Sequence, residues 1–562
     1  MKNSFRQALA TYTLLLAFAT GCNQENADLV LVNGRIWTAQ GEDSFVEAVA
    51  IRGNKIIQIG STQDMRKLAG KSTRVVDLEG KLAIPGFNDA HIHFLGGSIG
   101  LFEIDLTKAK TGADIVIAVD SFARLNPDAE WIRGRGWQYT QFPSGLPTVE
   151  DMKGLRSDRP IFLRAYDGHS GWANPMAMKL AGITNQTKPA GFGQIVLDAK
   201  GIPTGTLLED AQLLVSKFIP SPSRETQLEA LLQGLKMVSS LGITSMQNAS
   251  GSVNELALYL DLQLNGELTA RYSAALSVED RTTEDEIDSF RVMRTLLSTN
   301  PLIKADAIKF MLDGVIESHT AAMLKAYDDA PDEKGDFAIP LEKYRTLVNA
   351  LDKDGFRLYT HAIGDLAVRE ALNAYENAQQ VNGQQQRRNR VEHIETISPE
   401  DIPRFAKLDV MASMEPIHAD PGTMGVWKNA IGKDRLPYSF AWNSLLKENA
   451  HLVFSSDWPA CIDINPIRGI HVAVNRRTPE GFPEGGWIPE QKISIAKALL
   501  AYTRAGAYAS FEEEIKGQIK PGMLADIIVL SDDLFTIDPM RIASTQVILT
   551  IFDGKIIYEK GK

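Results

Sequence analysis

The sequence predicts an α/β protein built on a (β/α)8 barrel, and three observations lead to this prediction. Short hydrophobic segments with strand-like alternation recur along residues 85–514, and segments with helical periodicity lie between them. Such alternation favours parallel strands joined by helical crossovers, and eight such strands close a barrel. Several of the hydrophobic segments end in histidine, lysine or aspartate, and the C-terminal ends of barrel strands are where active-site groups lie.

Eight segments have the length and composition expected of barrel strands. They are the stretch around His91 and His93 and residues 242–248, 270–276, 307–313, 356–361, 390–393, 410–415 and 451–457. Helical spacing of apolar residues predicts helices between these strands, at residues 341–351, 367–375 and 493–508.

Both ends of the chain carry β-strand patterns. Residues 27–84 and 515–562 contain apolar runs that are broken by Asn-Gly, Gly-Asn and Asp-Gly turn pairs, which predicts antiparallel hairpins. Strands from both ends can complete one structure, because chain termini often lie close together. We therefore expect a small composite β-sandwich, with the barrel of residues 85–514 inserted between its two parts.

A long segment, about residues 101–241, separates the first predicted strand from the second. Helical patterns occur at 111–125 and 226–241, and the part between them is rich in Gly, Pro and aromatic residues. An insertion of this length on the catalytic side of a barrel predicts a lid or substrate wall. Its aromatic side chains could line an apolar pocket or form the insertion's own core. They are Trp131, Trp137, Tyr139, Phe142, Phe162, Tyr166 and Trp172.

The first 22 residues have the pattern of an export signal. Lys2 and Arg6 precede a short apolar run that ends in Thr-Gly-Cys22, which resembles a bacterial lipoprotein signal. The resemblance implies that Cys22 is lipidated and anchors an exported protein in the cell envelope, at the outer membrane in a Gram-negative cell. Ordinary signal cleavage, with Cys22 incidental, is the alternative.

Composition describes the remaining chain as globular. The 562 residues are 44% hydrophobic and 23% charged, enough for a large core. A net charge of −11 without a basic block or zinc-finger spacing argues against nucleic-acid binding. Only two cysteines are present, Cys22 and Cys461, so there is no disulfide framework. These features are compatible with either a monomer or a homo-oligomer.

The histidines of the first strand make half of a metal site. His91 and His93 are two residues apart, so both project to one face of an extended segment. The other candidates each follow a later hydrophobic segment, and they are Lys309, His361, His393 and Asp457. Imidazoles with a carboxylate suit a divalent ion such as zinc. Read singly, each of these residues could instead be structural.

Lys309 and Asp457 have specific alternatives. Lys309 lies in an apolar run, where an unpaired ammonium facing the barrel interior would be costly. It could instead point outward to a helix carboxylate, or bind an anionic substrate as an ammonium. Asp457 precedes Trp458-Pro459 and could cap a helix, although Ser455 and Ser456 already offer caps.

Together these motifs resemble the amidohydrolase superfamily, family 3. More narrowly, they resemble the branch with N-substituted formamide deformylase and the exoenzyme regulatory proteins. The match runs from about Ala27 to the end of the chain. The motifs are Pro85-Gly-Phe-x-Asp-x-His91-x-His93, the Lys309 strand, His361-Ala-Ile-Gly-Asp365, Glu392-His393, Ser456-Asp457-Trp458-Pro459 and Lys520-Pro-Gly-Met-Leu-Ala-Asp526.

The resemblance implies a role for each candidate ligand. It assigns one metal ion to His91, His93 and Asp457, and a second to His361 and His393, with Lys309 bridging both as a carbamate. Asp457 would also act as general base and then general acid. Residues that could contact the substrate, or be ordinary loop residues, are His169, Glu209, His319 and His418.

The expected function is hydrolysis of a non-peptide amide C–N bond in a small substrate, of the deformylase or deacylase type. A metal-bound hydroxide would attack the carbonyl, and Asp457 would protonate the departing amine. Two alternatives use the same scaffold: a mononuclear deaminase, or an esterase or lactonase. A third is a lipoprotein that keeps the barrel as a non-catalytic binding or regulatory module.

Overall fold

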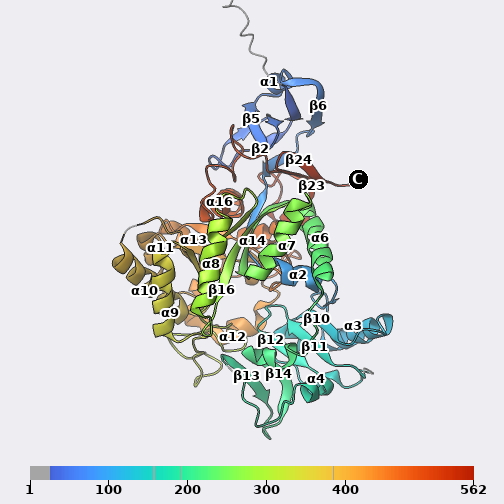
Figure 1. Cartoon of the computed structure of the whole chain (residues 1–562), viewed down its shortest axis with the longest axis vertical. Coiled ribbons are helices and arrows are strands. Elements are labelled where there is room, and N and C mark those ends of the chain that lie inside the picture. Colours follow the sequence, from blue (N-terminus) through green and yellow to red (C-terminus); the bar gives the residue numbers. More distant parts are fainter. Residues whose placement is uncertain (1–25, 156–157, 190, 384, 562) are drawn as a thin grey trace, which may run out of the picture.

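An eight-stranded parallel barrel occupies the middle of the computed structural model (Figure 1). The structure describes residues 26–155, 158–189, 191–383 and 385–561, so the predicted export signal and Cys22 lie outside the described residues. Within those ranges, no helix combines the length and apolar character needed to cross a bilayer.

The eight predicted strands are confirmed as the barrel, and neighbouring strands pair in parallel in chain order. Beyond the last strand, the ring is linked by backbone hydrogen bonds from Asp457 N to His91 O, 2.8 Å, and from His93 N to Trp458 O, 2.7 Å. The strands are β8 (Phe87–Ile92), β15 (Ile243–Gly251), β16 (Arg271–Val278), β17 (Ile303–Met311), β18 (Arg357–Ala362), β19 (Arg390–His393), β20 (Met411–Met414) and β21 (Leu452–Phe454).

Helices surround this barrel. The helix predicted at 493–508 is interrupted at Thr503, whose backbone is not helical, so it forms two helices instead of one. The surrounding helices are α6 (Arg224–Ser240), α7 (Val253–Leu264), α8 (Glu284–Leu296), α9 (Leu341–Lys353), α10 (Asp365–Asn382), α11 (Ile402–Leu408), α12 (Met424–Arg435), α13 (Trp442–Lys447), α14 (Pro466–Asn475), α15 (Ile495–Tyr502) and α16 (Arg504–Ala509).

Alternation along β17 explains which side chains reach the barrel interior. Ile308 and Phe310 belong to the large core that includes the surrounding helices. Ala307 points the other way and packs in a separate small cluster with Ala275 and Tyr359 of the neighbouring strands. Lys309 is two residues from Ala307 and is therefore on the interior face.

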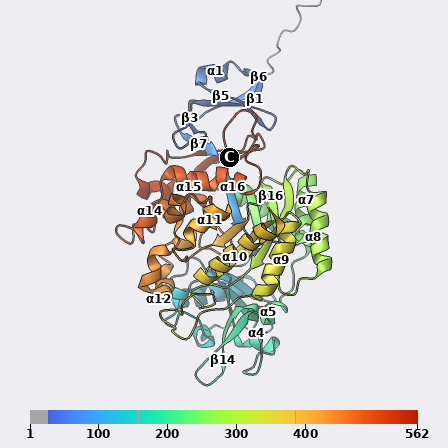
Figure 2. The same ribbon diagram turned by 90° about the vertical axis from the view of Figure 1, so that its left-hand side faces the viewer.

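Strands from both chain ends form two further sheets at one end of the molecule (Figures 1 and 2). A shared core that includes Leu31, Val49, Ile527 and Ile551 joins them, as expected of a composite sandwich. The four-stranded sheet contains β1 (Ala27–Val32), β4 (Ala48–Arg52), β5 (Lys55–Gly60) and β6 (Ala69–Asp77), and the six-stranded sheet contains β2 (Arg35–Trp37), β3 (Phe45–Val46), β7 (Leu82–Pro85), β22 (Ile527–Leu530), β23 (Val547–Phe552) and β24 (Lys555–Glu559).

The pairing in these sheets is partly parallel. β4 with β5, and β23 with β24, are the antiparallel hairpins expected from their Gly-containing turns. However, β1 pairs in parallel with β6, and β2 in parallel with β7. Two strands can pair in parallel only if the chain between them crosses back to the starting end. In both pairs, the connecting chain contains the β4–β5 hairpin and the helix α1 (Thr62–Arg66).

The insertion lies at the opposite end of the molecule from the terminal sheets (Figure 2). Five of the seven aromatic residues named above, including Trp137 and Trp172, pack into the insertion's own core. For these five, the expectation of a core role is confirmed. The helix α2 (Phe94–Gly100) precedes the insertion and packs against α6. The elements of the insertion are β9 (Ile104–Asp105), α3 (Gly112–Leu125), β10 (Ile132–Trp137), β11 (Ile161–Ala165), β12 (Ser170–Ala173), α4 (Pro175–Leu180), β13 (Gly193–Leu197), β14 (Pro203–Glu209) and α5 (Leu213–Ser216).

A buried ion pair ties the barrel to the terminal sheets. Arg271, at the start of β16, donates to both carboxylate oxygens of Asp526 at 3.1 and 3.2 Å, and to Asp553 at 2.9 Å. Arg271→Met should lower the free energy of unfolding by about 3–5 kcal/mol, because Asp526 keeps a buried charge without its partner. Urea unfolding measures this effect. The exposed control Arg281→Met should change it by less than about 0.5 kcal/mol, and an equally small change for Arg271→Met would contradict the prediction.

Candidate metal centre

The side chains expected to bind metal come together in one cavity of about 590 Å³ at the mouth of the barrel. They come from the C-terminal ends of β8, β17, β18 and β19 and from the loop after β21. Residues of the insertion complete the opposite wall of this cavity. The cavity-lining members of the predicted set are His93, Lys309, His361, His393 and Asp457. His91 is fully buried and contacts Lys309.

Carboxylates hold two of the imidazoles in a fixed orientation. His91 Nδ1 lies 2.7 Å from Glu392 Oε2, and His393 Nδ1 lies 2.9 Å from Glu415 Oε2. A carboxylate can only accept, so Nδ1 carries the proton in both rings and Nε2 presents its lone pair. Metal-binding histidines have this arrangement.

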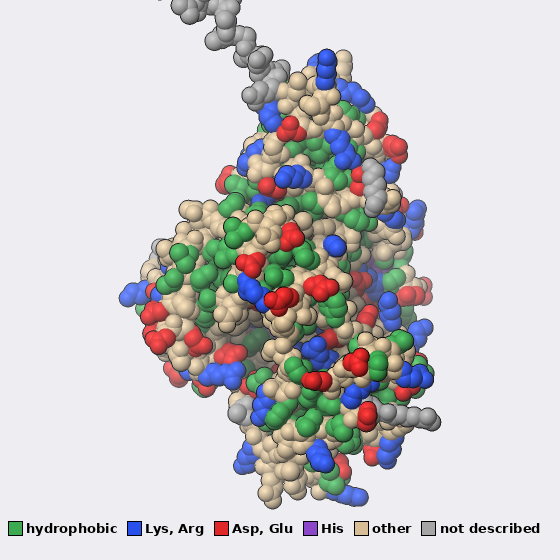
Figure 3. Space-filling model, turned by 45° about the vertical axis from the view of Figure 1, so that its right-hand side comes forward, with side chains coloured by type: hydrophobic (Ala, Val, Ile, Leu, Met, Phe, Trp, Pro, Cys, Tyr) green, Lys and Arg blue, Asp and Glu red, His purple; other side chains and the backbone are tan. Residues whose placement is uncertain are grey.

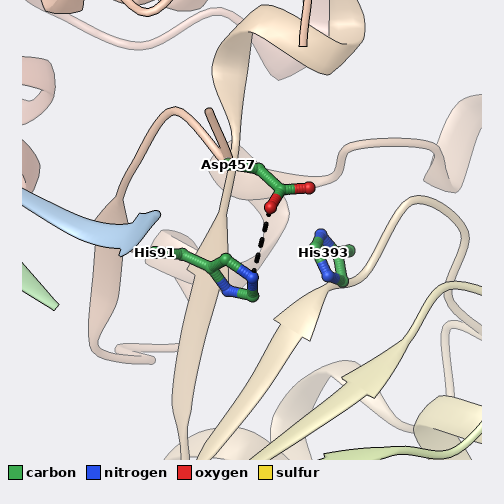
Figure 4. A group of neighbouring side chains, drawn as sticks. All are labelled: His91, His393 and Asp457. Carbon is green, nitrogen blue, oxygen red and sulfur yellow. Dashed lines mark ion pairs between the residues drawn. The ribbon is translucent and has the colours of Figure 1, made fainter. Parts of the chain in front are cut away.

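Asp457 lies between the imidazoles (Figure 4). Its Oδ1 is 3.4 Å from His91 Nε2 and 3.0 Å from His93 Nε2. Ligand atoms of His91, His393 and Asp457 all lie within 4.8 Å of one another. Oδ1 of Asp457 is buried without a hydrogen-bond partner among the described residues. A divalent cation would satisfy this oxygen together with the Nε2 lone pairs, so these residues fit a metal site.

The backbone is unusual at two of these positions. His393 has φ 74° and Asp457 has φ 57°, in the left-handed region that non-glycine residues seldom adopt. The hydrogen bond from Asp457 N to His91 O holds the aspartate in this conformation. Strained residues of this kind concentrate at functional sites, because the surrounding fold must compensate for their cost.

His361 completes the group of imidazoles. Its ring centroid is 4.4 Å from that of His393, and its Nε2 is 3.2 Å from Gly314 O. Burial lowers the pKa of both His91 and His361, and nearby cationic groups lower it further. Both rings are therefore neutral and able to act as ligands.

Lys309 is buried beside these histidines, with Nζ 3.2 Å from His91 Nε2. Within the described part of the chain it forms no ion pair with a carboxylate, which argues against the alternative of an outward-facing paired lysine. Burial lowers the pKa of its amine. An uncompensated ammonium at this depth would be costly.

Three of the four candidate substrate contacts surround the centre. His169 Nδ1 lies 2.7 Å from Glu209 Oε2; burial opposes its protonation, but Glu209 raises the pKa of His169 to about 9. His418 Nε2 is 3.7 Å from Asp457 Oδ2, and although burial opposes it, Glu395 raises the pKa of His418 to about 10. Both imidazoles are therefore cationic hydrogen-bond donors.

His319 lies elsewhere. Its Nε2 pairs with Asp329 at 2.8 Å and its ring packs against Tyr327, with ring centroids 4.7 Å apart. It is absent from the described residues that line the cavity.

The sequence matches the amidohydrolase family model over residues 74–558, which is most of the chain. The chain belongs to the amidohydrolase family. The matched range contains all the residues of the candidate metal centre.

Two similar proteins and one solved structure illustrate the match. Protein LONG AFTER FAR-RED 3 of Arabidopsis thaliana is 30% identical over 545 residues, covering 95% of this chain and 92% of that protein. N-substituted formamide deformylase of Arthrobacter pascens is 25% identical, covering 95% and 98%. A metal-dependent hydrolase of Pyrococcus horikoshii OT3 shares the fold with a TM-score of 0.70 at 23% identity, covering 91% of this chain and 99% of its own.

Other residues of the amidohydrolase centre were not predicted. Asp89 accepts hydrogen bonds from Ser456 N and Oγ, and burial raises its pKa to about 7. Asp313 accepts from three backbone N–H groups, and burial raises its pKa to about 8. Glu415 supports His393. An acidic residue next to a strand end is a weak signal that could have found these carboxylates.

Glu415→Gln should weaken metal binding about 10- to 100-fold, because the amide is a poorer acceptor for His393 Nδ1. Competition with a chromogenic chelator measures the affinity. Glu376→Gln, a half-exposed glutamate on α10, is the matched control. An affinity equal to wild type in Glu415→Gln would show that this contact does not support the metal ligand.

Proposed function

We propose that this amidohydrolase hydrolyses a non-peptide amide C–N bond, in the manner of its N-substituted formamide deformylase relative. The observation that carries this proposal is the convergence of His91 Nε2 and His93 Nε2 on Asp457 Oδ1, at 3.4 and 3.0 Å. His393 and His361 lie next to this group, with their ring centroids 4.4 Å apart, and Lys309 Nζ is 3.2 Å from His91 Nε2. The proposal assigns His91, His93 and Asp457 to one divalent ion and His361 and His393 to another, and imidazole with carboxylate ligands suits zinc.

Lys309 would join the two halves as a carbamate. Its amine would add to CO2 with loss of a proton, which replaces a buried cation by an anionic group with two oxygen ligands. Support comes from its position beside His91 and from the absence of a carboxylate partner in the described residues.

Asp457 would move the protons of the reaction. Bound metal ions would supply Lewis acidity, lowering the pKa of water and polarising the amide carbonyl. Burial alone would raise the pKa of Asp457, but His93, together with His393 and His418, lowers this pKa below its usual value and keeps the group ionised. As a carboxylate, Asp457 can take a proton from the attacking water and deliver it to the departing nitrogen.

His169 would bind the substrate through a hydrogen bond, and His418 would act on it through its positive charge. Glu209 engages Nδ1 of His169, which leaves Nε2 of the cationic ring to donate to the carbonyl oxygen, where negative charge develops. His418 Nε2 already donates to Ala460 O at 3.0 Å, so its cationic ring would stabilise that charge without a direct hydrogen bond. His319 is left out of this proposal because Asp329 already engages its Nε2.

The test is hydrolysis by the purified full chain, before and after chelation and zinc reconstitution. The panel contains N-substituted formamides, N-acetyl amines, esters, lactones and aminopurines. Zinc-dependent release of amine from amides is the expected result. Ammonia release from aminopurines alone would favour a deaminase, and acid release from esters or lactones alone an esterase or lactonase. A metal-loaded protein without any turnover would favour a binding or regulatory module.

A further inference from the structure

The wall that the insertion contributes to the cavity carries three arginines that the proposed reaction does not use. Arg133 and Arg135 lie on β10, and Arg164 lies on the neighbouring strand β11. All three line the same cavity as Lys309 and Asp457. Elsewhere on the surface, acidic and basic side chains are interspersed over the face drawn in Figure 3.

Strand register places these arginines side by side on one face. Arg135 is directly opposite Arg164 in the parallel pair of β10 and β11. The alternate residues Ile132 and Leu163 point to the other face, into the core of the insertion. The apolar residues occupy the face of this sheet that packs into the insertion. The guanidinium groups lie on the other face, which lines the cavity at the barrel mouth.

The positive charges are only partly matched. Glu103 pairs with Arg133 at 3.1 Å, whereas neither Arg135 nor Arg164 forms an ion pair with any described residue. The other acidic residues near this wall are engaged: Asp167 accepts from Tyr139, and Glu209 pairs with His169. Like charges directly opposite on neighbouring strands destabilise a sheet. An anion between Arg135 and Arg164 would remove this repulsion.

Arg135 is held in place for such an anion. Its Nη2 donates to Tyr166 O at 3.3 Å, and its Cδ lies against Gly100, where a Cβ would come within 3.3 Å. Burial lowers the pKa of Arg135, and the charge of Arg164 lowers it further, so a bound anion would favour the charged form. A fixed guanidinium loses little conformational freedom on binding.

Apolar side chains also line this cavity, among polar ones such as Gln212 and Ser216. They would accommodate a hydrocarbon group of the substrate. They are Ile99, Phe162, Ile219, Pro220, Pro222 and, from the barrel strand β17, Met311.

We propose that Arg135 and Arg164 bind a carboxylate of the substrate, so that the enzyme hydrolyses amides that also carry a carboxylate, such as N-acyl amino acids with an apolar side chain. A guanidinium fork matches a carboxylate with two parallel hydrogen bonds. Water gives its hydroxyl to the acyl carbon and its proton to the nitrogen, and the bound carboxylate is unchanged. This inference rests on the proposed amide hydrolysis and specifies its substrate class.

The test compares matched substrates on the zinc-loaded full chain. N-acetyl derivatives of alanine, leucine and phenylalanine, as racemates, are each paired with the corresponding carboxamide, and the ratio of kcat/KM for acid over carboxamide is measured. Arg135→Gln and Arg164→Gln should each lower this ratio about 10- to 100-fold. Arg164→Lys should lower it less, because the ammonium keeps the charge but not the fork. Added salt should lower the ratio in wild type.

Arg345→Gln is the control, because this half-buried residue of α9 is absent from the described cavity lining, and it should keep the wild-type ratio. A wild-type ratio near one, or a ratio unchanged in both glutamine variants, would overturn the inference. If formamides are hydrolysed but acids are not preferred over carboxamides, the proposed amide hydrolysis stands and only the inferred carboxylate-bearing substrate class is wrong. If no acetyl compound is hydrolysed, calorimetry with N-acetyl-phenylalanine decides: arginine-dependent binding supports the inference, and its absence overturns it.

Discussion

Lys309→Ala is expected to reduce the metal content of the purified protein from about two ions per chain to about one or none, because it removes the proposed bridge between the two halves of the centre. Elemental analysis of the wild type and the variant measures this stoichiometry. Amide hydrolysis should fall below detection in the same variant. Short carboxylic acids such as formate should restore part of both, since they can occupy the space left by the carbamate.

Lys304→Ala provides the matched control on the same strand. Lys304 lies at the opposite end of β17, where it pairs with Glu512, and it should leave the metal content unchanged. One ion in both wild type and Lys309→Ala would remove the bridging role and move the assignment toward a mononuclear deaminase-like site. No metal in wild type, even after reconstitution, would favour the binding module.

Asp457→Asn is expected to lower kcat by about 10²- to 10⁴-fold, because the amide cannot accept the proton of the attacking water. Its remaining oxygen can still act as a ligand, so metal content should fall less than activity. Steady-state kinetics with elemental analysis on the same preparation separates the two effects. The positive φ at this position favours asparagine as the least disruptive replacement.

Asp336→Asn, in an exposed loop, is the control for Asp457→Asn and should retain wild-type kcat. If Asp457→Asn loses its metal in proportion to its activity, the residue acts as a ligand only. A variant with full metal and full activity would exclude Asp457 from proton transfer.

Local patterns were sufficient to predict the barrel strands. Alternating apolar residues and Gly-rich boundaries depend on neighbouring residues, so β15, β16 and β18 each lie within a few residues of their predicted ranges. The parallel pairing of β1 with β6 was not predicted, because the strand pattern alone does not specify which strand is the neighbour.

The candidate ligands were predictable for the same reason. Each lies at or near the C-terminal end of a hydrophobic strand, and barrel closure brings these strand ends together. His319 also follows a strand, yet the loop turns it toward Asp329, because loop conformation depends on contacts that the strand pattern does not contain.

The sequence by itself determined the barrel, the ends of its strands and the residue types available for metal binding, since these depend on periodicity and chemistry along the chain. Only the tertiary structure decided which carboxylate supports which histidine and which side chains form the outer wall. His91 and Glu392 are 301 positions apart and meet because the barrel closes. Arg135 and Arg164 become neighbours through the register of two strands, which a single sequence does not specify.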